Sequence, residues 1–217
     1  MSISENITNL KKELPNHVCL VAVSKTKPIP NIMEAYHAGH RIFGENKIQE
    51  MVDKWEQMPK DIAWHMIGHV QTNKVKYMAE FVSLIHAVDS IKLLKEINKQ
   101  AKKHERVINC LLQIKIAEED SKFGMTEADA LALLNNASVK EFKNVNIVGL
   151  MGMATFTEDE VQLVSEFSQL KNFFDTHKTA FNFKTLSMGM SGDYKIAIAQ
   201  GSTMIRVGSS IFGERNY

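Results

Sequence analysis

A lysine that follows an alternating apolar segment is the first side chain here that could do covalent chemistry. Val21, Val23 and Lys25 occupy every second position, so in a β-strand their side chains share one face. Burial lowers the pKa of a lysine and makes its amine a nucleophile able to form a Schiff base. The same spacing also allows Lys25 to extend to solvent, with Lys27 and Pro28 simply ending the strand.

Two loops of small residues near the C-terminus form a candidate anion site. Residues 187–193 and 206–210 are rich in glycine and serine. Glycines let main-chain N–H groups approach an anion closely, and a following helix start adds partial positive charge. Arg206 lies two residues after Met204, so it can point into the same interior as that methionine. Two ordinary turns with a surface arginine are the alternative.

Short apolar segments alternate with helical patterns and must position these residues. The candidate strands are 18–24, 41–43, 63–67, 81–86, 107–114, 145–151, 185–188 and 204–207. The helical patterns between them cover 31–38, 46–57, 71–79, 90–104, 127–136, 158–178 and 193–200. Such alternation predicts a parallel sheet covered by helices. Eight units within residues 1–217 predict an α/β fold, a single (β/α)8 TIM barrel of one domain.

An open doubly wound sheet is the alternative fold, but it would need a glycine fingerprint or another switch-point site that the sequence lacks. In a closed barrel, functional residues lie at the carboxyl ends of the strands, and the loops after strands 7 and 8 are the usual phosphate site. Lys25 and both glycine loops fall at such ends. A lysine facing a phosphate clamp suits a phosphosugar handled as a Schiff base, or pyridoxal 5′-phosphate (PLP).

Several local patterns predict how individual helices begin and which side they bury. Thr126 with Asp129, and Thr157 with Glu160, have the spacing of helix-capping pairs. The apolar residues that we expect on one side of the long helix are Val161, Val164, Phe167, Leu170 and Phe174. The amphipathic stripe expected before the first strand comprises Ile3, Ile7, Leu10 and Leu14.

Composition excludes several classes of protein. The net charge of +1 argues against a strongly basic nucleic-acid binder. No run approaches the roughly 18 apolar residues of a membrane span, and the polar N-terminus does not resemble a secretory signal. Cys19 and Cys110 lie in apolar runs and are expected to be buried free thiols. We therefore expect a cytoplasmic protein that binds neither membrane nor nucleic acid.

His65 and His69 have a spacing that joins metal ligands on a helix, but here they flank Gly68 at the end of a strand. We therefore expect the two side chains to diverge and to bind no metal. For His65 the sequence leaves two roles open, contact with a cofactor or packing inside the barrel.

Seven stretches, taken together, resemble the YggS/PROSC family of pyridoxal phosphate homeostasis proteins. They are LVAVSKTKP at 20–28, FGENKIQE at 43–50, WHMIGHVQTNK at 64–74, SKFG at 121–124, GLMGM at 149–153, LSMGMS at 186–191 and IRVGSSIFG at 205–213. They follow one another over nearly the whole chain. The resemblance implies a barrel like the N-terminal domain of alanine racemase (fold-type III PLP proteins) without its C-terminal β domain.

The resemblance also implies a role for each site residue. Lys25 would carry PLP as a Schiff base. The residues implied to hold the phosphate are Ser191, Gly208 and Ser209, the last where threonine is common in the family. Arg206 would face the pyridine nitrogen, and Asn46 would lie beside the ring.

We expect these residues to bind the cofactor and not to catalyse a reaction. A fixed cation such as Arg206 disfavours protonation of the pyridine nitrogen and so weakens the ring as an electron sink. Racemases of this fold resemble a two-base design whose tyrosine comes from a second domain, and this sequence ends at Tyr217. The expected function is PLP homeostasis, meaning that the protein buffers or delivers the cofactor, as a monomer by default and with apo PLP-dependent enzymes as possible partners. A weak amino-acid racemase and a Schiff-base phosphosugar aldolase are the alternatives.

Overall fold

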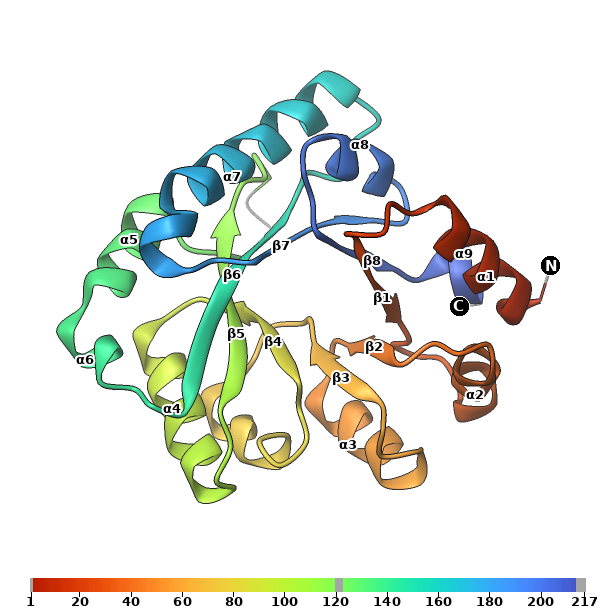
Figure 1. Ribbon diagram of the computed structural model, residues 1–217, viewed down its shortest axis with the longest axis horizontal. Coiled ribbons are helices and arrows are strands. Elements are labelled where there is room, and N and C mark those ends of the chain that lie inside the picture. Colours follow the sequence, from red (N-terminus) through yellow and green to blue (C-terminus); the bar gives the residue numbers. More distant parts are fainter. Residues whose placement is uncertain (1, 120–122, 214–217) are drawn as a thin grey trace.

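The computed structural model describes residues 2–119 and 123–213, and its eight strands form one closed barrel (Figure 1). The strands are β1 (Cys19–Val23), β2 (Ile42–Glu45), β3 (Ala63–Met66), β4 (Leu84–Val88), β5 (Ile108–Lys115), β6 (Val145–Met153), β7 (Thr185–Met190) and β8 (Met204–Val207). Every neighbouring pair is parallel, and β1 pairs with β8 from Cys19 opposite Met204 to Ala22 opposite Val207. The predicted (β/α)8 barrel is therefore confirmed, and the open-sheet alternative is wrong.

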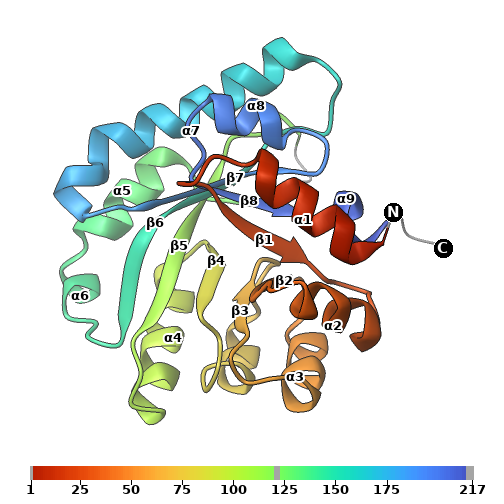
Figure 2. The same cartoon turned by 45° about the vertical axis from the view of Figure 1, so that its right-hand side comes forward.

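Helices cover the outside of the barrel. They are α1 (Ile3–Glu13), α2 (Ile29–His37), α3 (Ile48–Gln57), the 3-10 helix η1 (Thr72–Tyr77), α4 (Ile91–Lys103), α5 (Glu127–Asn135), α6 (Ala137–Lys140), α7 (Glu160–Phe181), α8 (Tyr194–Ala199) and α9 (Ser209–Phe212). Figure 2 shows α1 lying across the outside of the barrel beside α9. Ile7 and Leu10 of the predicted stripe are the buried side chains of α1.

The strands divide the apolar residues between an outer and an inner core. Leu20 and Ala22 pack outward with the helices, whereas Val21 packs inside the barrel with residues such as Met151 and Met204. The alternation that places Val21 and Met204 on the interior face is therefore present in the structure.

The fourth strand begins later than its apolar run predicts. The amides of Phe81 and Val82 donate to the carbonyl of Met78, so this segment continues the turn after η1. The ring of Phe81 stacks on Trp55 of α3, with 4.4 Å between the ring centroids. Phe81 therefore lies outside the sheet, in a turn that packs against α3.

Helix α7 differs from its prediction at its first turn. Its N-cap is Asp159, whereas Thr157 accepts a hydrogen bond from the amide of Asp159 and caps nothing in the helix. Val161 is 79% exposed and Val164 is 37% exposed. At about 100° per residue, Val164 lies about 60° and Val161 about 120° around the helix axis from Phe167, so Val164 is at the edge of the buried face and Val161 is beyond it. The Thr126 cap of α5 is present as predicted.

Both cysteines are free thiols: Cys110 is buried, as predicted, but Cys19 is only half-buried. Among the described residues, no helix combines the length and apolar character needed to cross a membrane.

A neutral histidine is buried where α2 leads into β2. The Nε2 atom of His40 lies 2.7 Å from the carbonyl oxygen of Ile42, and its ring packs edge-on against Phe43. Burial, reinforced by the positive charge of Lys11, lowers the pKa of His40 to about 4.

We expect His40→Gln to reduce the acid sensitivity of the fold. Unfolding raises the pKa of this side chain from about 4 to its ordinary value near 6.5. The unfolded chain therefore takes up a proton, and stability is lost as the pH falls through this window. Urea unfolding at pH 7 and pH 5 should show that the variant loses about 2 kcal/mol less than the wild type. The control variant His104→Gln changes an exposed histidine and should lose as much free energy of unfolding between pH 7 and pH 5 as the wild type. Equal losses in all three proteins would contradict the expectation.

Candidate functional site

The residues predicted for the site gather at the carboxyl ends of the strands. Lys25 is half-buried two residues after β1, and Asn46 is half-buried directly after β2. Ser191 directly follows β7, Gly208 directly follows β8, and Ser209 is the exposed first residue of α9. Arg206 lies within β8 and is 4% exposed. The barrel therefore brings all of them to one mouth, although they span most of the sequence.

A hydrogen bond joins the two small-residue loops. The amide of Gly208 donates to Oγ of Ser191 at 3.1 Å. A Cβ atom on Gly208 would lie 3.3 Å from the carbonyl oxygen of Val23, so the loop after β8 also lies close to the strand that leads to Lys25. A hydroxyl and a main-chain amide from two loops are suitable donors for an anion.

Asp193 adds a carboxylate to the loop that follows β7, and the sequence patterns predicted no role for it. Its Oδ1 accepts a hydrogen bond from the amide of Met190 at 2.5 Å. Burial raises the pKa of Asp193, and the positive charge of Arg206 opposes that rise. The carboxylate thus fixes the turn after β7. The position of Asp193, three residues after Met190, is the feature of the sequence that could have indicated this role.

Arg206 is a buried cation held by neutral acceptors. Its Nη1 donates to Oγ of Ser187 at 2.6 Å, and its Nη2 donates to the carbonyl of Gly152 at 3.0 Å. Burial lowers the pKa of Arg206 to about 10, with Asp193 acting in the opposite direction. The guanidinium therefore stays charged at neutral pH, with its position fixed from β6 and β7.

Two buried histidines continue this polar chain across the interior. His86 Nδ1 lies 3.1 Å from Oγ of Ser187, and His86 Nε2 lies 3.1 Å from Nδ1 of His65. Burial lowers the pKa of His65 to about 3 and that of His86 well below its ordinary value, so both rings are neutral. The sequence left two roles open for His65, and the structure shows that it packs and hydrogen-bonds within the barrel.

His69 points elsewhere, as expected. Its side chain is 45% exposed, lies 3.5 Å from Asp89 and stacks on Phe123. Sequence reasoning assigned no role to His86 or Ser187. The alternation of His86 with the interior residue Leu84 could have identified His86 as an inward side chain.

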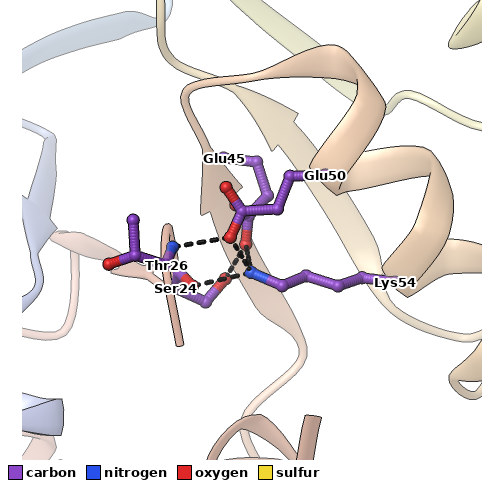
Figure 3. Close-up of polar contacts among 5 residues, drawn as sticks. All are labelled: Ser24, Thr26, Glu45, Glu50 and Lys54. Atoms are coloured by element: carbon purple, nitrogen blue, oxygen red, sulfur yellow. Dashed lines mark hydrogen bonds and ion pairs between the residues drawn. The ribbon is translucent and has the colours of Figure 1, made fainter. Parts of the chain in front are cut away.

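A second polar cluster lies beside Lys25 and was not predicted (Figure 3). Nζ of Lys54 lies 2.8 Å from Glu45 Oε1, 2.7 Å from Glu50 Oε1 and 2.8 Å from the carbonyl oxygen of Ser24. Glu45 is fully buried, and burial raises its pKa to about 6 although Lys54 opposes the rise. We call Glu45, Glu50 and Lys54 the Lys54 cluster.

Comparison with known proteins assigns the chain to a family. The alanine racemase N-terminal domain family matches residues 1–216. A pyridoxal phosphate homeostasis protein of Vibrio alginolyticus is 37% identical, with 100% of this chain and 99% of the relative covered. One from Escherichia coli K12 is 39% identical over 94% of this chain and 88% of the relative. This chain belongs to the pyridoxal phosphate homeostasis protein family.

Solved structures agree with this family assignment. The structure of PipY of Synechococcus elongatus with PLP bound has a TM-score of 0.89 at 35% identity. The match covers 98% of this chain and 100% of PipY. The same protein determined without PLP has a TM-score of 0.92 at 35% identity, with 98% of this chain and 100% of PipY covered. Alanine racemase of Clostridium difficile shares the fold at 10% identity and a TM-score of 0.80, and this chain covers 57% of it.

Of the seven motif stretches, SKFG lies partly outside the described residues, because positions 121 and 122 are not described. Tyr217, at which the sequence ends, also lies outside the described residues. The other six stretches are fully described. All six of them supply strands or strand ends of the mouth, and the stretch 43–50 also supplies two members of the Lys54 cluster, Glu45 and Glu50.

We expect Gly68→Ala to disturb the backbone at Asn46. A Cβ atom on Gly68 would lie 2.3 Å from the carbonyl oxygen of Asn46, a contact that the main chain must shift to relieve. The free energy of unfolding should fall by about 1–3 kcal/mol, as overpacking usually costs. Gly192→Ala is the matched control, because nothing lies within 4 Å of its added Cβ. Urea unfolding measures both variants, and equal stabilities would contradict the close approach.

Proposed function

We propose that this protein binds PLP through Lys25 and buffers the cofactor or hands it to other proteins. Three observations support the proposal. The family relatives are named pyridoxal phosphate homeostasis proteins. PipY, 35% identical, has a structure with PLP bound. The observation that carries most weight is that the barrel brings Lys25 to the same mouth as the Ser191–Gly208 pair.

Each residue then has a defined part in binding. The amine of Lys25 condenses with the aldehyde of PLP, forming a C=N bond and releasing water. The groups proposed to hold the phosphate are the hydroxyl of Ser191 and the amides of Gly208 and Ser209. Arg206 faces the pyridine nitrogen, and Asn46 lies beside the ring. The donor set fits a phosphate, because the Ser191 hydroxyl and the Gly208 amide adjoin one another, and a phosphate oxygen would accept from the amide in place of the Ser191 Oγ that now accepts from it at 3.1 Å.

We propose binding without turnover. PLP supplies an electron sink when its pyridine nitrogen is protonated. Arg206 is charged and rigidly held, so it disfavours a second positive charge beside it. The described tyrosines have other contacts: Tyr36 donates to Asp61, Tyr77 is exposed beside Lys76, and Tyr194 packs against the outer core.

The unit that binds PLP is proposed to be one barrel domain formed by residues 1–217, because the proposed ligand contacts all come from a single chain. We propose a monomer in the cytoplasm, and its two free thiols suit a reducing compartment. Apo forms of PLP-dependent enzymes are the proposed recipients.

Lys25→Ala should abolish covalent binding of PLP. The wild type mixed with PLP should gain a yellow absorption band that borohydride removes, leaving a stable adduct on Lys25 detectable by peptide mass spectrometry. Lys47→Ala is the matched control, since Lys47 is an exposed lysine directly after Asn46 at the same mouth. Absence of a band in the wild type, or its retention in Lys25→Ala, would overturn the proposal.

PLP-loaded protein should activate an apo PLP-dependent enzyme without itself turning over amino acids. Activation is measured with and without a trap for free PLP, and activation that survives the trap indicates direct transfer. Alanine incubated with the loaded protein should keep its optical rotation. Sustained loss of rotation that depends on Lys25 would show a racemase and refute the non-catalytic assignment.

A further inference from the structure

We propose that Glu50 and Lys54 are positioning residues for Lys25, acting by holding the two peptide groups that adjoin it. The inference rests on the proposed function of Lys25, and it deepens that function by explaining how the amine is presented. The side chains of Lys54 and Glu50 contact the backbone of Ser24 and Thr26, and Glu45 contacts the Ser24 hydroxyl (Figure 3).

Lys25 lies in a tight turn with an unfavourable residue at its third position. The amide of Lys27 donates to the carbonyl of Ser24 at 3.0 Å, which closes a four-residue turn. Thr26 has a φ of +62°, whereas Lys25 is not among the residues with positive φ. This is the pattern of a type II turn, whose third position usually requires glycine or asparagine. A β-branched residue there is strained and persists only when its surroundings hold it.

Two contacts from α3 supply that restraint. The amide of Thr26, in the peptide group that follows Lys25, donates to Glu50 Oε1 at 2.6 Å. The carbonyl of Ser24, in the peptide group that precedes Lys25, accepts from Nζ of Lys54 at 2.8 Å. Both ends of the Lys25 backbone are therefore held by charged groups, and such hydrogen bonds are stronger than those between neutral groups.

The restraint is itself rigid. An ammonium has three N–H groups, and those of Lys54 have three acceptors, on Ser24, Glu45 and Glu50. Glu45 also accepts from Oγ of Ser24 at 2.5 Å, so the strand end before Lys25 is held twice. Helix α3 thus sets the position of the Lys25 backbone at the mouth of the barrel.

Glu50→Ala tests the inference, because the Glu50 side chain is 23% exposed and its loss removes the acceptor of the Thr26 amide. We expect Lys25 to capture PLP about tenfold more slowly, the equivalent of one strong hydrogen bond. Glu50→Gln keeps an oxygen acceptor and should stay within about twofold of the wild type. Glu56→Ala removes an exposed carboxylate from the same helix and should change nothing. Stopped-flow absorbance measures the rates at a temperature where circular dichroism shows every variant folded.

A double-mutant cycle with Thr26→Gly separates positioning from general stability. Glycine adopts a positive φ without strain, so in the Thr26→Gly background the added Glu50→Ala should slow capture by less than about threefold. An undiminished tenfold loss in that background would overturn the inference, as would equal rates for Glu50→Ala and Glu56→Ala.

A second readout keeps this inference distinct from the function on which it rests. Trinitrobenzenesulfonate reacts with lysine amines without PLP, and peptide mass spectrometry reports its rate at Lys25 alone. Glu50→Ala should change the labelling rate at Lys25 but not at Lys47. If wild-type Lys25 captures no PLP, the proposed function fails. If labelling at Lys25 is also the same in Glu50→Ala and the wild type, the positioning inference fails too.

Discussion

The parallel pairing of β1 with β8 is the interaction on which the rest of the mouth depends. Four residue pairs, from Cys19 opposite Met204 to Ala22 opposite Val207, join the first strand to the last. They bring the turn of Lys25 next to the loop of Gly208, although nearly the whole sequence separates them. Lys27 adds a second link between the segments that follow β1 and β8, because its Nζ donates to the carbonyls of Phe212 and Gly213 at 3.1 Å each. Without this closure Lys25 and the hydrogen-bonded pair of Ser191 and Gly208 would belong to opposite edges of an open sheet.

The sequence predicted the features that repeat and missed those that depend on a single distant contact. Strand alternation placed Val21, Met204 and Arg206 on the interior face correctly, because a period of two is an intrinsic property of strands. It misplaced the start of β4, because the stacking of Phe81 on Trp55 is a contact between a turn and helix α3, which are far apart in the sequence. It also misjudged Val161 and Val164, because apolar type alone does not say which part of a helix reaches the barrel.

The same distinction applies to the mouth. Lys25, Asn46 and Ser191 could be located because the carboxyl ends of parallel strands converge. Lys54 could not, because a lysine on a helix ordinarily lies in solvent, and only the fold shows that its amine reaches Ser24 and Glu45. A buried lysine is costly unless its charge is compensated, and Glu45 and Glu50 provide that compensation. The chain therefore places a buried structural lysine against the peptide group that precedes Lys25, the half-buried lysine that we propose binds PLP.

The chain of contacts from Arg206 to His65 also has a direction. A guanidinium can only donate, so Oγ of Ser187 accepts from it and can direct its own proton to Nδ1 of His86. In that arrangement neutral His86 carries its proton on Nε2 and donates it to Nδ1 of His65. His65 then carries its proton on Nε2 as well. When the Ser187 hydroxyl donates to His86, a single direction of donation therefore runs from Arg206 through both imidazoles across the barrel.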